Sequence, residues 1–429
     1  MKSSIWHPFT QMKTAAEPLK VRSGKGIWLE LEDGRMIMDL ISSWWVNLHG
    51  HSQPDIAKAI YDQAQKLEHV IFAGFTHDPA EQLSKRLIPH LPDSVNRIFF
   101  SDNGSTAVEV ALKMAWQYWK NKGETGRNRF IAFEGSYHGD TVGAMSAGSR
   151  SMFFRVFNDL LFDVQHVPYP STFIGDDKVE QKEAESLKAI ARLFEENPAQ
   201  YAGLIIEPLV QGSGGMRMCR PEFLQKLDRL VHEHQTLLIY DEVMTGFGRT
   251  GDWFASIKTN TKPDLMCLSK GITGGFLPLS VTACSDDIYQ AFYSDDPMKT
   301  LYHGHSYTAN PLGCAAALAS LTLMENNTAA FKNMDERHCV FADELAGNPA
   351  VNRVRFCGTI IAMDVVTGEE EGYLNQVSGK IKEQALEKNM LLRPLGNTLY
   401  LMPPYCITDE ELQNAYKGIT EILAAVSDL

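Results

Sequence analysis

A lysine and an aspartate each follow an apolar segment, at the point where a buried strand would end. Asp241 ends the apolar run 237–240, and Lys270 follows the run 265–268, before a glycine-rich turn at residues 271–275. If the two runs are neighbouring parallel strands, both side chains lie at the same edge of one sheet. Ligands of open α/β sheets bind at this edge, outside the carboxyl ends of the strands.

The two residue types have complementary chemistry. Burial disfavours the charged form of a lysine, so we expect the pKa of Lys270 to be lowered. An amine with a lowered pKa attacks a carbonyl and forms a Schiff base. A lysine that holds an aldehyde and an acid that keeps a ring nitrogen protonated are the protein part of a pyridoxal phosphate site. Taken alone, Lys270 is explained more simply as a lysine that ends a strand at the surface. The second apolar run, which ends in Asp241, makes the cofactor site the favoured interpretation.

Two earlier loops could complete such a site. The predicted strand 97–101 leads through the polar turn 102–106 into an amphipathic helix over residues 107–120. A glycine turn at a helix N-terminus is an anion site, because free N–H groups and the positive end of the helix dipole meet there. An ordinary helix cap explains the same residues. After the predicted strand 130–133, the aromatic pair 137–138 between two glycines suits stacking on a flat ligand, or is a plain loop.

The N-terminal part predicts a small β unit followed by two tryptophans. Residues 24–39 alternate as a hairpin with its turn at Asp33 and Gly34. Trp44 and Trp45 come next, and adjacent side chains of a strand face opposite ways. We therefore expect one of the tryptophans to line a cavity or an interface, while simple packing of both is the alternative.

Two other patterns point to different functions. Residues 246–251 match G-x-G-x-x-G after a strand, which is the fingerprint of a nicotinamide dinucleotide fold. That fingerprint should open a helix, and residues 252–254 carry no helical period. His232 and His234 lie on a predicted helix end without a third ligand at a metal-site spacing. We therefore predict neither a dinucleotide fold nor a metal site.

Composition excludes several classes of protein. The chain has 429 residues, 44% of them apolar and 22% charged, as in ordinary globular proteins. Its formal net charge of -13 argues against a nucleic-acid partner, for which a basic surface is expected. Seven scattered cysteines without a C-x-x-C pair predict reduced thiols and a cytoplasmic location. No signal peptide is visible, and no apolar run reaches the roughly 18 residues of a membrane span.

The C-terminal third predicts a separate, smaller domain. Asn310 is the expected cap of a long helix, and Pro311 is its first helical residue. We place the domain boundary in this helix. A strand over residues 358–366, a helix over 376–388 and a strand over 398–402 follow. A capping box at residues 408–411 begins the last helix. We predict an N-terminal arm with a small-domain β unit, a large cofactor-binding domain and a small domain, over residues 1–48, 49–312 and 313–429.

Three segments together resemble the signature of class III pyridoxal-phosphate aminotransferases: residues 241–243, 246–251 and 269–271. The resemblance covers nearly the whole chain. It implies fold type I, an α/β fold with a mostly parallel seven-stranded sheet, helices on both faces and a smaller α+β domain. It also implies small-molecule substrates, pyridoxal 5'-phosphate as cofactor, and a homodimer with active sites at the subunit interface.

The resemblance assigns roles around the cofactor ring. Lys270 would hold the aldehyde and later move the α-proton, and Asp241 would pair with the ring nitrogen. Tyr137 would stack on one face of the ring and Val243 would press on the other. The catalytic residues implied in this way are Lys270, Asp241 and Tyr137.

Phosphate binding is assigned to both subunits. Gly104 and Ser105 would bind the phosphate in their own chain, and Ser306 would reach it from the partner subunit. Many relatives have a threonine after a proline at this place. Here His305 precedes Ser306, so the hydroxyl is kept and the loop is altered.

Four further segments resemble one branch of the family, the enzymes of biotin synthesis that convert 8-amino-7-oxononanoate to 7,8-diaminononanoate; they are residues 5–10, 42–45, 137–141 and 393–396. The likeness implies four substrate-binding residues: Phe9, Trp44, Gly304 and Arg393. Arg393 would bind the substrate carboxylate as a planar bidentate donor.

The amino donor stays open between S-adenosylmethionine and lysine. Users of S-adenosylmethionine usually carry a tyrosine at the position of Phe9, so this chain lacks that hydroxyl. Phe9 and residues 303–306 look more like relatives that use lysine. Alternatives are another class III aminotransferase, acting on an ω-amino acid or ornithine, and a protein that shares the sheet without the activity.

Overall fold

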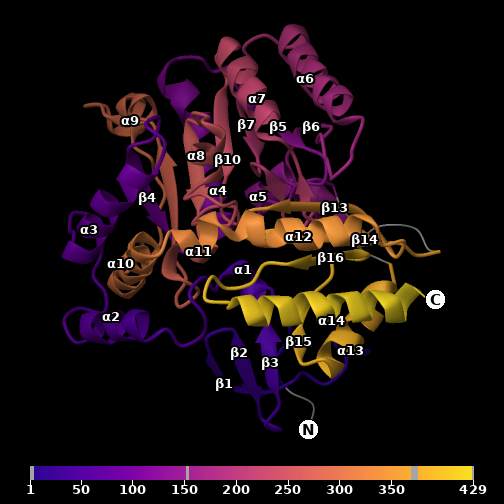
Figure 1. Ribbon diagram of the computed structural model, residues 1–429. Helices are drawn as coiled ribbons and strands as arrows, with labels where there is room; N and C mark the ends of the chain where they lie inside the picture. The colour runs from indigo at the N-terminus through magenta and orange to yellow at the C-terminus, as the bar shows by residue number, and fades with distance from the viewer. Residues whose placement is uncertain (1–3, 151–153, 369–374, 428–429) are drawn as a thin grey trace.

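A seven-stranded, mostly parallel sheet forms the centre of the large domain (Figure 1). The computed structural model describes residues 4–150, 154–368 and 375–427. The strands, in spatial order, are β4 (Arg97–Ser101), β12 (Ser280–Cys284), β11 (Leu265–Leu268), β10 (Leu237–Asp241), β7 (Tyr201–Ile206), β5 (Arg129–Phe133) and β6 (Gln165–Val167). Only β12 runs against its neighbours in this sheet, as the described pairings show. The predicted α/β class is confirmed.

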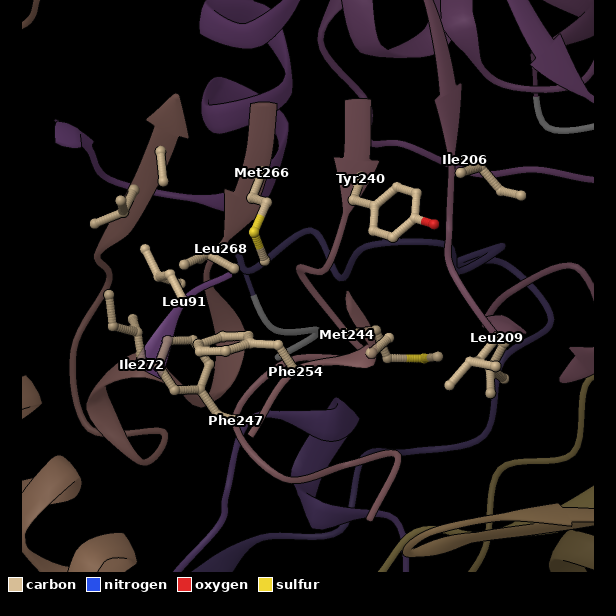
Figure 2. Close-up of a cluster of buried hydrophobic side chains, with 14 of the residues drawn as sticks. Leu91, Ile206, Leu209, Tyr240, Met244, Phe247, Phe254, Met266, Leu268 and Ile272 are labelled. Atoms are coloured by element: carbon tan, nitrogen blue, oxygen red, sulfur yellow. The ribbon is translucent and has the colours of Figure 1, made fainter. Parts of the chain in front are cut away.

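Strands β10 and β11 are adjacent and parallel, as the sequence predicts. Tyr240 lies opposite Met266, and Asp241 lies opposite Cys267. Figure 2 shows Tyr240 and Met266 extending from these strands toward the same apolar cluster. Both strands are buried along their whole length, because a parallel sheet in the middle of a domain is covered on both faces.

Helices cover both faces of the sheet, and alternate strand residues belong to different cores. Leu238 and Tyr240 pack into one apolar cluster, whereas Leu237 and Ile239 pack into another. The second cluster includes the apolar face of α4 (Gly104–Asn121). The other helices of this domain are α2 (Pro54–Ala64), α3 (Asp78–Leu87), α5 (Val142–Ala147), α6 (Val179–Glu196), α7 (Pro221–Glu233), α8 (Ala255–Thr259), α9 (Asp286–Phe292) and α10 (Pro311–Asn326).

A smaller α+β part lies below the large sheet in Figure 1 and has its own apolar core. Its antiparallel sheet has the order β13 (Val351–Cys357), β14 (Ile360–Val365) and β16 (Thr398–Leu401). Its helices are α11 (Ala329–Lys332), α12 (Met334–Ala346), α13 (Val377–Glu387) and α14 (Asp409–Ser427). The predicted capping box is present, since the Thr408 hydroxyl accepts from the Glu411 N–H. Strand β13 was missed, because charged residues and a bulge interrupt its alternation.

Strands from the N-terminal and C-terminal parts of the chain share one four-stranded sheet. The predicted hairpin is β2 (Trp28–Leu31) and β3 (Met36–Asp39), with β1 (Val21–Lys25) added outside. β3 also pairs in parallel with β15 (Met390–Leu391), so the N-terminal β unit belongs with the C-terminal part. A short hairpin of β8 (Val210–Gln211) and β9 (Arg217–Met218) completes the described strands. The division into three units stays a prediction.

Candidate active site

A cavity of about 700 Å³ opens at the carboxyl ends of β10 and β11. It is lined by nine of the eleven residues predicted to form the site: Phe9, Trp44, Gly104, Ser105, Tyr137, Asp241, Val243, Lys270 and Arg393. These residues come from the N-terminal arm, the large domain and the C-terminal part. The sheet edge therefore brings together segments that are far apart in the sequence.

Lys270 comes two residues after the end of β11 and has a strained backbone. Its φ is +36°, which is uncommon for a residue with a side chain. Its Nζ lies 5.1 Å from the ring centroid of Trp45. Burial lowers the pKa of Lys270, with Asp241 and Glu207 acting in the opposite direction. The direction predicted from the sequence is therefore found, and it favours a neutral, nucleophilic amine.

The Asp241 carboxylate is nearly fully buried and is held on both oxygens. One oxygen accepts from the Val243 N–H at 3.1 Å, and the other lies 2.7 Å from Nδ1 of His138. Since an ionised carboxylate only accepts, the proton of this bond belongs to the imidazole. Sequence reasoning noted His138 only as half of an aromatic pair, because its contact with Asp241 joins residues 103 positions apart.

The two residues predicted to enclose the cofactor ring come from the loop after β5 and from the segment after β10. Tyr137 and Val243 both line the cavity, and the Tyr137 hydroxyl donates to Asp140 at 2.8 Å. Burial raises the pKa of Tyr137, so its phenol stays neutral. The Tyr137 ring packs nearly parallel to Phe154, with centroids 6.0 Å apart. These contacts hold the ring in place before any ligand binds.

The first turn of α4 lines the cavity. Asn103 caps the helix, and the side chain of Asn103 accepts from the Thr106 N–H at 3.1 Å. A Cβ at Gly104 would lie 2.6 Å from Cγ1 of Val243, so only glycine allows this approach. The Ser105 hydroxyl accepts from the Asp140 N–H at 3.2 Å. Helix α4 has 18 residues, and residues of its first turn line the cavity. A helix N-terminus at a cavity is what an anion site requires.

Glu207 is a second residue that sequence reasoning missed. It follows β7, lines the cavity and is buried. Its carboxylate accepts from the N–H groups of Tyr137 at 3.0 Å and Gly212 at 2.9 Å. Burial raises the pKa of Glu207 to about 7. Its place at the end of an apolar strand, like that of Asp241, was the available signal.

Phe9, Trp44 and Arg393 lie together in the lining of the cavity, and we call these three residues the far wall. The Arg393 guanidinium lies 4.2 Å from the Trp44 ring centroid, and Phe9 meets the same ring edge-on at 5.8 Å. Trp45 also lines the cavity, and its indole N–H donates to the Tyr400 hydroxyl at 2.9 Å. The expectation that one of the tryptophans lines a cavity is confirmed, and the second lines it too, because residues 42–45 form a left-handed turn and not a strand.

Gly304 and Ser306 do not line this cavity. Both are exposed, in the segment between α9 and α10. The predicted contact of Gly304 with the substrate therefore stays a prediction. The predicted binding of the phosphate by Ser306 from the partner subunit also stays a prediction.

The G-x-G-x-x-G segment forms turns after β10 and does not open a helix. Its Arg249 is buried and donates to the carbonyl groups of Trp45, Asn47 and Pro403 at 3.1–3.3 Å. Arg249 thus links the segment after β10 to the chain at Trp45 and Asn47 and to the chain at Pro403. No helix among residues 4–150, 154–368 and 375–427 has the length and apolar character needed to cross a bilayer.

The sequence matches the family model "Aminotransferase class-III" over residues 10–423. This chain belongs to that family. An adenosylmethionine-8-amino-7-oxononanoate aminotransferase from Synechococcus elongatus is 55% identical, over 98% of both chains. The enzyme of the same name from Geobacter sulfurreducens is 40% identical, over 99% of this chain and 96% of that one.

Solved structures agree with this class III assignment. The Methanocaldococcus jannaschii enzyme of the same name superimposes with a TM-score of 0.92 and 36% identity, covering 98% of this chain and 97% of that one. A PLP-bound amine transaminase from an uncultivated Pseudomonas species gives a TM-score of 0.92 at 29% identity, with 99% of each chain covered. The chain is a fold type I, pyridoxal-phosphate-dependent transferase.

The residues present fit this cofactor. A buried carboxylate, Asp241, and a lysine with a lowered pKa, Lys270, face one cavity. Gly104 and Ser105, in the first turn of α4, line the same cavity, and a helix N-terminus favours an anion such as a phosphate.

Proposed function

We propose that this aminotransferase converts 8-amino-7-oxononanoate to 7,8-diaminononanoate in biotin synthesis. The observation that carries the proposal is the 55% identity, over 98% of both chains, to an enzyme named for that substrate. Pyridoxal phosphate, when bound, supplies an electron sink and carries the amino group from donor to acceptor. The residues of this chain bind and orient the reactants and move protons.

Lys270 and Asp241 carry the chemistry in this proposal. Lys270 Nζ would hold the cofactor aldehyde and, as a free amine, would take and return the substrate α-proton. Its lowered pKa supports this role, because a proton carrier works best with a pKa near the working pH. Asp241 would pair with the ring nitrogen of the cofactor, and the hydrogen bond from His138 supports the charged form of its carboxylate.

Gly104, Ser105, Tyr137 and Val243 bind the cofactor, and the far wall binds the acceptor. An acceptor with a carboxylate at one end of a long apolar chain needs a cation at a distance from the reacting carbon. Arg393 supplies a planar guanidinium over the Trp44 ring, where the ring also shields it from water. Trp44 and Phe9 offer apolar surface to the chain between the two ends.

The amino donor in this proposal is S-adenosylmethionine or lysine, both cationic amino acids. Asp140 lines the cavity beside Tyr137 and supplies a negative charge for either. The names of the relatives favour S-adenosylmethionine. Phe9 favours lysine, since a missing hydroxyl loses a hydrogen bond worth about 0.5–1.5 kcal/mol.

The proposal includes a homodimer in the cytoplasm, without a nucleic-acid or membrane partner. A dimer is supported by the exposure of Gly304 and Ser306 on a loop outside the cavity of their own chain. Large apolar side chains near the arm are exposed too, Trp6 among them at 85%. The seven cysteines are all unpaired, which fits a reducing compartment.

One assay tests the proposed activity. Purified protein with bound pyridoxal phosphate is given 8-amino-7-oxononanoate and, in separate reactions, S-adenosylmethionine, lysine, ornithine or an ω-amino acid. We expect 7,8-diaminononanoate, detected by mass spectrometry, with one of the first two donors. Turnover of ornithine or an ω-amino acid with other keto acids, and none with 8-amino-7-oxononanoate, would assign the chain to another class III activity.

The donor is decided without any acceptor. The pyridoxal form is mixed with S-adenosylmethionine or lysine alone, and loss of its absorbance band is followed. Loss with lysine only would support the inference from Phe9. Loss with S-adenosylmethionine only would show that a tyrosine at this position is dispensable.

A further inference from the structure

Four consecutive residues beside the cavity have left-handed backbone conformations. Ser42, Ser43, Trp44 and Trp45, which form α1 (Ser42–Trp45), have φ values of 50°, 49°, 80° and 74°. We call these residues the tryptophan turn. A left-handed residue with a side chain is strained and persists only where its surroundings hold it. The surroundings of this turn must therefore supply specific contacts.

The strain has a geometric result. In a strand, Trp44 and Trp45 would face opposite ways, but in the tryptophan turn both line the cavity. Trp44 joins Arg393 in the far wall, and Trp45 is fixed by its bond to the Tyr400 hydroxyl. Relaxation of the turn to an ordinary conformation would remove one indole ring from the cavity.

A buried carboxylate holds the amide side of the turn. Asp39, the last residue of β3, accepts from the N–H groups of Ile41 at 3.2 Å and Ser43 at 3.0 Å. It also accepts from the Ser43 hydroxyl at 2.6 Å, and Nε2 of His51 lies 3.0 Å from it. Nδ1 of His51 accepts from the Asn47 side-chain amide at 3.1 Å, which directs the Nε2 proton toward Asp39.

A buried cation holds the carbonyl side. The Arg249 guanidinium donates to the carbonyls of Trp45 and Asn47, at 3.3 and 3.1 Å. An anion thus meets N–H groups at the start of the turn, and a cation meets carbonyls at its end. This charge arrangement matches the dipoles of the turn, and charge-assisted hydrogen bonds are the stronger kind.

We propose that Asp39 is a positioning residue of the far wall: its carboxylate keeps the tryptophan turn left-handed and so sets the affinity for the acceptor. Asp39 does not line the cavity, so it acts through Ser43 and the backbone. The proposal rests on the proposed function for the identity of the acceptor. The state of the turn itself can be measured without any substrate.

The test compares Asp39→Asn with Asp33→Asn, an exposed aspartate at the tip of the same hairpin. In the Asp39→Asn variant an amide nitrogen replaces one carboxylate oxygen and cannot accept from His51 and Ser43, so the turn should loosen. We expect faster hydrogen exchange in the segment 40–48 of the holoenzyme and unchanged exchange in β10. The KM for 8-amino-7-oxononanoate should rise about tenfold, as for one lost charge-assisted bond, while kcat falls less. Cofactor affinity should change by less than about twofold.

Several outcomes would overturn the proposal. Unchanged exchange in segment 40–48 would show that Asp39 does not hold the turn. Faster exchange with an unchanged KM would show that the turn does not set acceptor affinity, and an equal rise of KM in Asp33→Asn would show a general effect. If Asp39→Asn does not fold, Ser43→Ala removes one donor and should give smaller changes in the same directions. A wild-type protein inactive on 8-amino-7-oxononanoate would refute the proposed function, and the exchange measurement would still decide whether Asp39 holds the turn.

Discussion

Nδ1 of His138 lies 2.7 Å from a carboxylate oxygen of Asp241, and both side chains are buried. In the proposed mechanism, this imidazole supports the charge of the acid that would pair with the cofactor ring. A buried carboxylate that loses a hydrogen-bond donor becomes harder to ionise. We therefore expect His138 to influence how well Asp241 would keep a proton on the ring nitrogen.

Replacing His138 should weaken the enzyme without removing its lysine. His138→Leu leaves a buried acceptor unsatisfied, which costs about 1–3 kcal/mol and predicts a roughly 10–100-fold lower kcat. His138→Gln keeps an N–H donor and should recover part of the rate. Stopped-flow kinetics and the absorbance band of the bound cofactor check this. Equal rates for the leucine variant and wild type would contradict it.

Asp241→Asn should have a larger effect. The change keeps the shape but removes the charge, and breaking a buried charged pair costs about 3–5 kcal/mol. If much of this cost falls on the transition state, the rate drops by roughly 10²–10³. The same kinetic and absorbance measurements apply. An unchanged rate with an unchanged band would show that the carboxylate does not act on the cofactor.

Lys270→Ala should nearly abolish turnover. The variant loses a proton-transfer group, worth roughly 10²–10⁴ in rate, and the covalent bond to the cofactor as well. Pyridoxal phosphate should still bind through its phosphate, which equilibrium dialysis can measure. Lys262→Ala, at an exposed lysine near β11, is the matched control and should keep the wild-type rate. Activity of the Lys270 variant within about tenfold of wild type would refute its role.

Hybrid dimers test whether Ser306 serves the other subunit. Ser306→Asp should weaken cofactor binding, because a carboxylate repels the phosphate. Mixing Lys270→Ala chains with Ser306→Asp chains gives hybrids with one intact site if Ser306 acts across the interface. Random pairing then predicts about a quarter of wild-type activity at limiting cofactor. If Ser306 acted within its own chain, no intact site would form and mixing would restore nothing.

Stability should depend on pH through His232. Its ring lies 2.6 Å from Asp228 and 3.1 Å from Asp264. The bond to Asp228, followed by that to Asp264, raises the pKa of His232 from 6.5 to about 10. A raised histidine pKa stabilises the fold fully below the unfolded pKa, and this contribution is lost as the pH rises through about 10.

The difference in Tm between wild type and His232→Gln should therefore shrink from about pH 6 to pH 10.5. The effect is modest, because the His232 side chain is 38% exposed and solvent screens the pair. His234→Gln is the control, at a histidine two residues away that stacks on Phe194. A constant difference across this pH range would contradict the prediction.

Local sequence was sufficient for the features that depend on one strand, one turn or one cap. Asp241 and Lys270 end two apolar runs, and parallel strands must place such ends at one edge. The α4 cap and the Thr408 capping box follow from residues within a single turn. For the two caps, the interacting atoms lie within a few positions of each other along the chain.

Other features were decided only by tertiary structure. His138 meets Asp241 across 103 positions, and Arg249 bonds to the carbonyls after the tryptophan turn across about 200. The left-handed turn itself runs against the local preference of serine and tryptophan. Contacts from β3, β16 and the loop after β10 outweigh that preference, and no local pattern records which distant groups will supply them.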